Sequence, residues 1–316
     1  MRAAVVNVLG EAPKYQSFRD AVAERGEDLI RVKAAGLHPV VRARASGQHY
    51  SSTGEVPLIP GVDGVGIAPD GRRVYFGVMR PPWGTMAELA PAPNGLQVPV
   101  PDGLDSAMAA AIANPGMSAW LSLQERGGLV AGEAVLVMGA TGVAGGLAVQ
   151  VARRLGAKRV IGVGRNVDAL KDTDVDAVIG LNQPEEALLE AFRAESAQGI
   201  DLVIDYLWGR PTELLLRALA TGFKASATQK TRLVEVGTSA GPDITLPGAV
   251  LRSIDLHLLG SGFGSAAMDK ILAAIPQLFN LAAEGKLTID VETVPLEQVE
   301  SAWNRNANGR RIVFTA

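Results

Sequence analysis

The stretch GATGVAGG at residues 139–146 has the residue types and spacing most specific for chemistry in this sequence. It follows the apolar run AVLVM and precedes LAVQVARRLGAKRV, so it joins a predicted strand to a predicted helix. Gly139, Gly142 and Gly145 allow a tight turn, a close approach of the backbone to a ligand and close helix packing. Together they would place a dinucleotide pyrophosphate on the N-terminus of the helix. A tight turn without a ligand is the alternative that the glycines alone leave open.

The next predicted strand, RVIGVG, indicates which dinucleotide is bound. It ends at Gly164 and is followed by Arg165 and Asn166. About 20 residues beyond the glycine motif, NAD-binding sites place an Asp or Glu on the ribose 2′-hydroxyl. An arginine at that place can instead hold a 2′-phosphate with two charge-assisted hydrogen bonds. We therefore predict NADPH as the cofactor, with a solvated arginine at a strand end as the alternative.

Further cofactor contacts are expected where other parallel strands end, because ligands of open parallel sheets bind outside the carboxyl ends of the strands. Gly237 and Thr238 follow the run RLVEV, and Gly260 and Ser261 follow LHLL. Asp205 ends the run DLVID, where it either belongs to the same site or caps the following helix. The predicted cofactor-binding residues are Gly139, Ala140, Thr141, Gly142, Val143, Gly145, Gly164, Arg165, Asn166, Gly237, Thr238, Gly260 and Ser261.

The helices and strands that must position these residues follow two different patterns along the chain. Up to about residue 114, short strand-like runs alternate with turn signals, which predicts a strand-rich domain. From about residue 119, apolar strands alternate with amphipathic helices, which is typical of a doubly wound parallel sheet. The final run RIVFTA has no place in that sheet and is assigned to the first domain. We predict an α/β protein with one domain over 1–118 and 265–316 and a Rossmann domain over 119–264.

Composition excludes several classes of protein. The 316 residues are 47% hydrophobic and carry a net charge of −3, with no long basic run, so we expect neither nucleic acid nor a membrane as partner. The sequence has no cysteine, which excludes disulfides, thiolate nucleophiles and cysteine-based zinc sites. No apolar stretch approaches the length of a signal peptide or a membrane span. These features predict a cytoplasmic protein with a small-molecule substrate.

Several motifs together resemble the medium-chain dehydrogenase/reductase superfamily, and within it the zinc-independent quinone oxidoreductase branch. They are RVKAAGLHPVV, PGVDGVG, GTMAELA, ANPGMSAW, VLVMGATGVAG and the C-terminal segment EGKL…VPLEQVESA, and the likeness covers essentially the whole chain. The resemblance implies a GroES-like catalytic domain beside the Rossmann domain. It also implies a homodimer, in which the edge strand of the second sheet, LHLLG, pairs across a two-fold axis.

The resemblance also implies that no catalytic zinc is bound. Zinc-dependent relatives hold the metal with cysteine, histidine and cysteine at the places of His38, Val62 and Asn114, and a valine side chain cannot ligate a metal. The quinone oxidoreductase branch has asparagine at the place of His38, followed by proline, which Pro39 matches. At that place His38 should lie near the nicotinamide and could donate a hydrogen bond to a substrate carbonyl. A purely structural histidine is the alternative.

Two further residues are catalytic candidates by the same resemblance. Tyr50, in SGQHYSS, resembles a tyrosine in the loop that borders the substrate pocket, although the loop is a residue longer and lacks the usual proline. A surface tyrosine is the alternative. Ser118 matches a small hydroxyl residue that approaches the nicotinamide, or it is part of the core at a helix. The predicted catalytic residues are His38, Tyr50 and Ser118.

The sequence excludes two other classes of enzyme. GTSAG at 237–241 has the glycine and serine spacing of an esterase nucleophile elbow, but PDITLPG follows instead of a helix. No tyrosine has a lysine four residues on, which excludes a short-chain dehydrogenase. We predict an NADPH-dependent, zinc-free reductase that transfers hydride to a quinone or an α,β-unsaturated carbonyl. A non-catalytic NADPH-binding redox sensor or regulatory protein on the same fold is the alternative.

Overall fold

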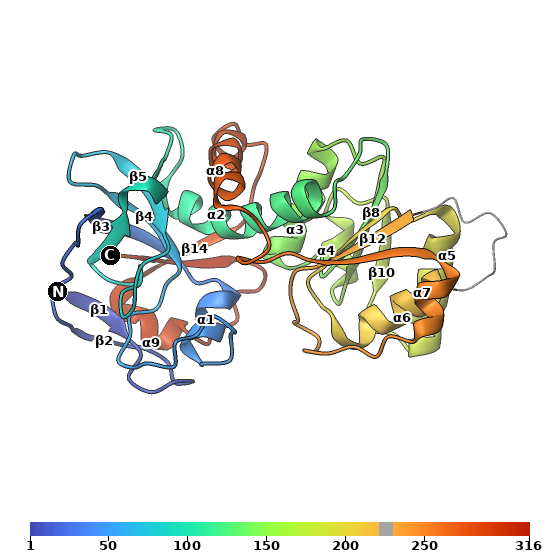
Figure 1. The fold of residues 1–316 in the computed structure, drawn as a ribbon, viewed down its shortest axis with the longest axis horizontal. Coiled ribbons are helices and arrows are strands. Elements are labelled where there is room, and N and C mark those ends of the chain that lie inside the picture. Colours follow the sequence, from blue (N-terminus) through green and yellow to red (C-terminus); the bar gives the residue numbers. More distant parts are fainter. Residues whose placement is uncertain (221–229) are drawn as a thin grey trace. The chain divides into compact units, whose positions relative to one another are not determined.

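The computed structural model describes residues 1–220 and 230–316, and these fold into two compact units (Figure 1). The first unit holds Met1–Asn114 with Leu272–Ala316, and the second holds Pro115–Ile271. The limits between them fall inside two helices, α2 (Ser106–Leu121) and α8 (Met268–Ala283), each of which contains a proline. The domain limits at 118 and 264 that the sequence predicts stay a prediction.

The first unit is rich in strands. A seven-stranded sheet has the order β14-β15-β3-β4-β5-β7, with β6 also paired to β3, and β1 and β2 form a separate hairpin. The strands are β1 (Arg2–Val5), β2 (Lys14–Ser17), β3 (Glu27–Gly36), β4 (Asp63–Ile67), β5 (Arg73–Gly77), β6 (Leu89–Pro93), β7 (Val98–Pro99), β14 (Val291–Pro295) and β15 (Arg311–Thr315). The short helices are α1 (Pro39–Ala45) and α9 (Val299–Ala302).

Strand β3 shows why this sheet forms from its sequence. Ile30, Val32 and Ala34 are buried while Arg31 and Lys33 are exposed, which is the period-2 pattern of a strand with one face on a core. Strand β15, the C-terminal run RIVFTA, pairs with β3 in antiparallel register. This run therefore lies in the sheet of the first unit.

The second unit is a six-stranded, wholly parallel sheet of order β10-β9-β8-β11-β12-β13. This is the 3-2-1-4-5-6 order of a doubly wound dinucleotide-binding sheet, and α3 lies on the face opposite α5 and α6 (Figure 1). The predicted α/β fold class is confirmed. The strands are β8 (Ala134–Met138), β9 (Arg159–Gly164), β10 (Ala177–Gly180), β11 (Leu202–Asp205), β12 (Lys230–Glu235) and β13 (Asp255–Gly260). The helices are α3 (Val143–Arg154), α4 (Val167–Lys171), α5 (Glu185–Gln198), α6 (Gly209–Leu219) and α7 (Gly248–Ser253).

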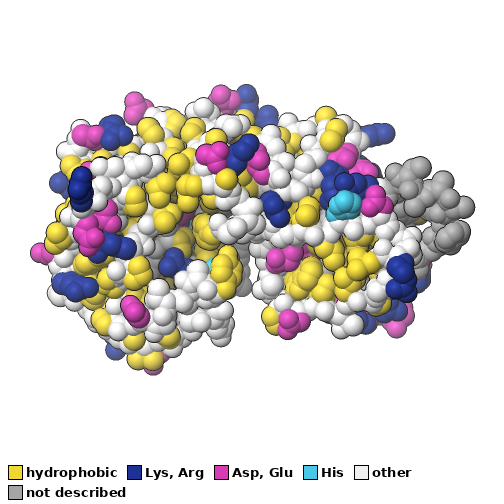
Figure 2. All heavy atoms as spheres, in the orientation of Figure 1, with side chains coloured by type: hydrophobic (Ala, Val, Ile, Leu, Met, Phe, Trp, Pro, Cys, Tyr) yellow, Lys and Arg dark blue, Asp and Glu magenta, His cyan; other side chains and the backbone are white. Residues whose placement is uncertain are grey.

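The sequence of each strand in this sheet matches its place. The apolar side chains of β8, β9 and β11 are buried, as expected for strands of a parallel sheet that helices cover on both faces. Within residues 1–220 and 230–316, strand β13 pairs with β12 alone, and none of its side chains is buried, so it is the edge strand that the sequence predicts. On each unit, the face drawn in Figure 2 has acidic and basic side chains interspersed. Across the described residues, no helix has the length and apolarity that a membrane crossing would need.

Candidate cofactor site and neighbouring cavity

The glycine loop between β8 and α3 has a geometry that only small residues permit. Gly139 has φ +86°, and its N–H and that of Ala140 both donate to the Val163 carbonyl, at 2.8 and 2.9 Å. A Cβ atom on Gly145 would lie 2.2 Å from the Gly139 carbonyl oxygen, so the loop closes tightly against the helix. Helix α3 begins directly after Gly142, which offers no side-chain cap. The free N–H groups of its first turn are therefore available to an anion such as a pyrophosphate.

The end of β9 lies against this loop. A Cβ atom on Gly164 would approach the Thr141 side chain to 3.0 Å, so the two strand ends are in contact. Arg165 follows with an exposed side chain, and no acidic group within the described residues pairs with it. Asn166 caps α4, since its Oδ1 accepts a hydrogen bond from the Ala169 N–H at 3.1 Å. Arg165 is thus free to bind a phosphate, whereas the Asn166 side chain already has a structural partner.

The remaining predicted cofactor residues lie at the same edge of the sheet. Gly237 and Thr238 follow β12, and Gly260 and Ser261 end and follow β13, which runs parallel to it. The Ser261 N–H donates to the Glu235 carbonyl at 2.8 Å, which fixes the two strand ends together. The glycine loop follows β8 in this same parallel sheet, so all these residues share the carboxyl edge. Residues 241–247, after GTSAG, contain no helix, so this stretch has no nucleophile elbow.

Asp205 at the end of β11 is fully buried and accepts hydrogen bonds from the turn that follows the strand. Its Oδ1 accepts hydrogen bonds from the N–H groups of Leu207 and Trp208, at 2.8 and 3.0 Å. Its Oδ2 accepts one from the Thr212 hydroxyl at 2.5 Å. Burial raises the pKa of Asp205, and these hydrogen bonds offset part of that rise. Asp205 thus stabilises the turn that leads into α6 and contacts the helix through Thr212, and a place in the cofactor site stays a prediction.

Ser118 lies on α2 beside Tyr206, which follows β11. Burial raises the pKa of the Tyr206 hydroxyl strongly, and the neighbouring Ser118 hydroxyl offsets part of the effect. The contact is not a well-formed hydrogen bond, since the buried Tyr206 oxygen lacks a partner of good geometry. Both residues belong to the second unit. The catalytic role of Ser118 stays a prediction.

His38 precedes α1 in the first unit, and its side chain is fully buried. Its Nε2 lies 3.2 Å from Oδ1 of Asp63, at the start of β4. The other oxygen of Asp63 accepts a hydrogen bond from the Tyr75 hydroxyl at 2.7 Å. Burial, and then the charge of Asp63, raise the pKa of Tyr75 well above its usual value. No group of three or more metal-ligating side chains occurs within residues 1–220 and 230–316.

Tyr50, the third catalytic candidate, is exposed over 76% of its surface. Its ring packs on that of His49, with centroids 4.1 Å apart. The His49 Nδ1 in turn lies 2.8 Å from the Ser51 hydroxyl. The contacts of this loop are thus between residues adjacent in the sequence. The role of Tyr50 in substrate binding stays a prediction.

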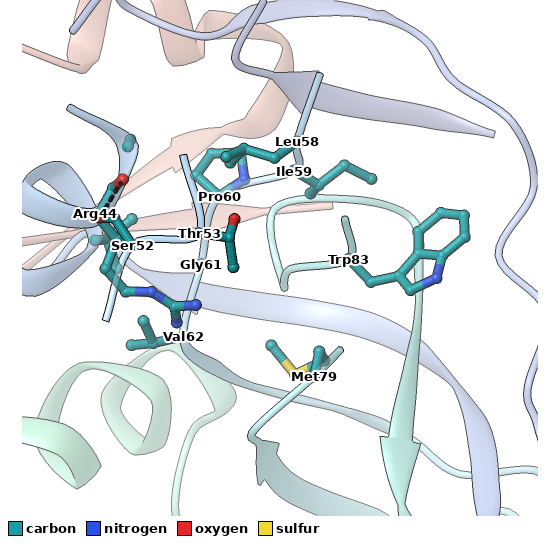
Figure 3. A pocket seen from close by; sticks show the side chains of 12 residues that line it. Arg44, Ser52, Thr53, Leu58, Ile59, Pro60, Gly61, Val62, Met79 and Trp83 are labelled. Carbon is teal, nitrogen blue, oxygen red and sulfur yellow. Dashed lines mark hydrogen bonds between the residues drawn. The ribbon is translucent and has the colours of Figure 1, made fainter. Parts of the chain in front are cut away.

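A cavity of about 50 Å³ lies beside this loop, and we call it the Arg44 cavity. Figure 3 shows the Arg44 side chain extending from α1 into the group of lining residues. The Ser52 hydroxyl donates to the Arg44 carbonyl at 3.0 Å and so ties the loop to the helix. The cavity is lined by Val41, Arg44, Ala45, Ser52, Thr53, Leu58, Ile59, Pro60, Gly61, Val62, Met79 and Trp83.

Sequence reasoning missed two residues of this region. The sequence around Arg44 resembles that of an ordinary arginine on the surface of a helix. Its place between the apolar residues Val41 and Ala45 is the signal that it lies close to an apolar pocket. Asp63 lies within PGVDGVG, where an acidic residue among small and apolar ones in a predicted strand indicates a buried carboxylate with a partner. Neither signal identifies the partner.

Comparison with known proteins places the whole chain among reductases. No family model matches the sequence. The chain is 29% identical to "Probable NADPH-dependent quinone reductase tdiC" of Emericella nidulans, over 96% of each chain. It is also 29% identical to prostaglandin reductase-3 of Bos taurus, over 88% of this chain and 77% of the other. The quinone oxidoreductase from Thermus thermophilus, whose structure was solved alone and with NADPH, superimposes over the full length of both chains, with a TM-score of 0.80 and 28% identity.

Proposed function

Since the chain belongs to the medium-chain dehydrogenase/reductase superfamily, in its quinone oxidoreductase-like branch, we propose that it is an NADPH-dependent reductase of conjugated carbonyl compounds. The membership itself makes it an oxidoreductase of the quinone reductase type. The proposal adds two finer statements: the cofactor is NADPH, and the acceptor is a quinone or an α,β-unsaturated carbonyl.

The observation that carries the cofactor proposal is that a tightly closed glycine loop lies beside Arg165, for which no acidic partner occurs within the described residues. Gly145 lies so close to Gly139 that no side chain fits there, as in the glycine loops that bring the backbone close to a pyrophosphate. Arg165, exposed beside Gly164 and Thr141, offers a planar fork of donors to a 2′-phosphate. When bound, NADPH would supply the hydride. The protein's own residues hold and orient the cofactor at the carboxyl edge of the sheet.

The acceptor proposal follows from the residues at the family's zinc positions. His38, Val62 and Asn114 stand there, and Val62 has no donor atom. Without a Lewis acid, polarisation of an unactivated ketone or acidification of an alcohol is hard to achieve. A quinone or enone is already electron-poor, so hydrogen bonds to the developing oxyanion are enough assistance. We propose His38 as one such donor.

The test is turnover of purified protein with NADPH and a panel of quinones, enones, alkenals and simple ketones, with product analysis. We expect oxidation of NADPH with the conjugated acceptors and little or none with simple ketones or alcohols. Equal rates with simple ketones would contradict the acceptor proposal. The homodimer through β13 and the cytoplasmic location stay predictions.

A further inference from the structure

The Arg44 cavity has an unusual lining for a small apolar pocket. Nine of its twelve lining residues are glycine or apolar, two are hydroxyl residues, and one is an arginine. In the view of Figure 3 the Arg44 guanidinium lies near Thr53 and Val62. Val62 stands at one of the family's zinc positions. A cation in such surroundings has lost part of its hydration, and burial accordingly lowers the pKa of Arg44.

Arg44 has no counter-ion within the part of the chain that the structure describes. Its neighbour Arg42, on the same helix, differs in this respect, because the Nε of Arg42 donates to the Trp303 carbonyl at 2.8 Å. Half-buried arginines elsewhere are paired too, such as Arg232 with Glu133. A partly desolvated charge without a partner costs free energy, which a bound anion would recover.

Arg44 is the charged residue among those that line the cavity. His49 lies near enough for the Arg44 charge to act on it: burial and, after it, that charge lower the pKa of His49. No acidic side chain lines the cavity.

The size of the cavity limits the anion. A volume of about 50 Å³ has room for about four water-sized groups, at roughly 10–15 Å³ each. A carboxylate with the carbon atom that carries it has this size. The apolar walls suit the carbon atoms, and the Thr53 hydroxyl can donate a hydrogen bond to one of the oxygens, whereas the Ser52 hydroxyl already donates to the Arg44 carbonyl.

We propose that the Arg44 cavity binds a carboxylate group of the acceptor, so that the substrate class is a conjugated carbonyl compound with an apolar body and a carboxylate side chain. This inference rests on the proposed reductase function for the chemistry, and on Arg44 for the recognition. Arg44 is then a specificity-determining residue, which contributes to acceptor binding and takes no part in the hydride transfer.

A matched pair of acceptors tests the proposal: a 1,4-naphthoquinone with a propanoate side chain, and the methyl ester of the same compound. Two methylene groups separate the carboxylate from the quinone, so the two rings have nearly the same reactivity. We expect kcat/KM to be at least about 10-fold higher for the acid. Arg44→Met should remove this preference by lowering kcat/KM for the acid about 10- to 100-fold, as expected when a charge-assisted contact is removed, with the ester unaffected.

Two further variants serve as controls. Arg44→Lys should restore part of the preference, because it keeps the charge. Arg42→Met removes an arginine two residues away on the same helix and should keep the preference, whatever it does to stability. Loss of the preference in Arg42→Met, or an Arg44→Met variant that still prefers the acid, would overturn the proposal.

A binding measurement separates this proposal from the reductase function. 2-Naphthalenepropanoate has no reducible group, and calorimetry measures its affinity without turnover. Binding to the wild type that falls about 10-fold or more in Arg44→Met supports the carboxylate site even if neither quinone is reduced, a result that would overturn the proposed function alone. No binding to the wild type, together with equal rates for acid and ester, would overturn the carboxylate site and leave the reductase function standing.

Discussion

The imidazole Nε2 of His38 lies 3.2 Å from the carboxylate Oδ1 of Asp63, and both side chains are buried in the first unit. The distance suits an ion pair or a hydrogen bond, but the angle between the groups is poor, so both atoms lack a partner of good geometry. The second Asp63 oxygen is held by the Tyr75 hydroxyl. Asp63 therefore has one oxygen with a good hydrogen bond, to Tyr75, and one oxygen whose contact with His38 a small movement of the imidazole would change.

The first prediction concerns His38. Truncation in His38→Ala leaves the Asp63 carboxylate without its neighbour in a buried place, so we expect a loss of about 1–3 kcal/mol in the free energy of unfolding. If the imidazole also donates to the acceptor oxygen, kcat and kcat/KM should fall together about 10- to 100-fold, with NADPH affinity nearly unchanged. Melting temperatures and kinetics per folded molecule give both quantities.

The variant His38→Asn separates these two effects. Asparagine is the residue of the quinone oxidoreductase branch at this place and keeps a hydrogen-bond donor, so it should retain much of the rate. An alanine variant with wild-type kcat per folded molecule would remove His38 from the mechanism and leave it a structural residue beside Asp63.

The second prediction concerns cofactor choice. Arg165→Gln should weaken NADPH binding about 10- to 100-fold and leave NADH binding nearly unchanged, because the substitution removes a charge-assisted hydrogen bond to the 2′-phosphate, which NADH lacks. Fluorescence titration of both cofactors measures this. The wild type should bind NADPH much more tightly than NADH, and equal affinities in the wild type would contradict the assignment of Arg165.

The third prediction uses two adjacent glycines of α3. A Cβ atom on Gly145 would lie 2.2 Å from the Gly139 carbonyl oxygen, whereas one on Gly146 would lie 3.7 Å from the nearest atom, the Ala140 carbonyl oxygen. Gly145→Ala should therefore cost about 1–3 kcal/mol and weaken NADPH binding, because the loop must open. Gly146→Ala should stabilise the helix by about 0.5–1 kcal/mol.

Thermal unfolding and cofactor titration of these two variants provide a matched comparison. Equal behaviour of the two would mean that the loop adjusts freely, and the close packing of Gly145 against Gly139 would then have no bearing on cofactor binding.

These glycines also show what a sequence can predict. The loop, the strand before it and the helix after it are local features, and local spacing with apolar periodicity is enough to place them. The edge position of β13 and the return of β15 to the first sheet followed from apolar runs and from the absence of a place for RIVFTA in the second sheet.

Contacts between distant residues could not be predicted in the same way. The pairing of His38 with Asp63 depends on the register of β3 against β4, which contains a bulge between Val32 and Ala34. Whether an acidic side chain lies close enough to pair with Arg44 depends on residues distant in the sequence, and no local pattern predicts it. Asp205 is intermediate: the sequence indicated a polar residue with a role at the end of the strand, and only its hydrogen bonds show that it stabilises the turn before α6.

The fourth prediction follows from the raised pKa of Asp205. A carboxyl group whose pKa is higher in the folded than in the unfolded chain binds more protons when folded, so its contribution to stability is fully present below the unfolded value. That contribution is lost as the pH rises from the ordinary aspartate range through the raised pKa. The wild type should therefore lose stability over this window.

Asp205→Asn should remove that loss, because asparagine does not ionise and keeps an oxygen for the N–H groups of Leu207 and Trp208. Denaturant unfolding at several pH values between about 4 and 7 measures the difference. Asp172→Asn, at an exposed position, is the control and should follow the wild type. Parallel pH profiles for the wild type and Asp205→Asn would contradict the prediction.

The last prediction is the homodimer. In the part of the chain that the structure describes, strand β13 pairs with β12 on one side and with no strand on the other, and Leu258 on this strand is 36% exposed. An edge with an apolar side chain is thus open to pairing. A second copy can cover it through an isologous contact, in which any substitution occurs twice. Leu258→Glu should then raise the dimer dissociation constant at least about 100-fold, since an unpaired charge in a buried contact costs about 3 kcal/mol or more. Val130→Glu, at a more exposed apolar residue of the same unit outside β13, should leave it unchanged. Light scattering at micromolar concentration measures the assembly, and a monomeric wild type, or a Leu258→Glu variant that dimerises as tightly as the wild type, would exclude β13 as the dimer contact.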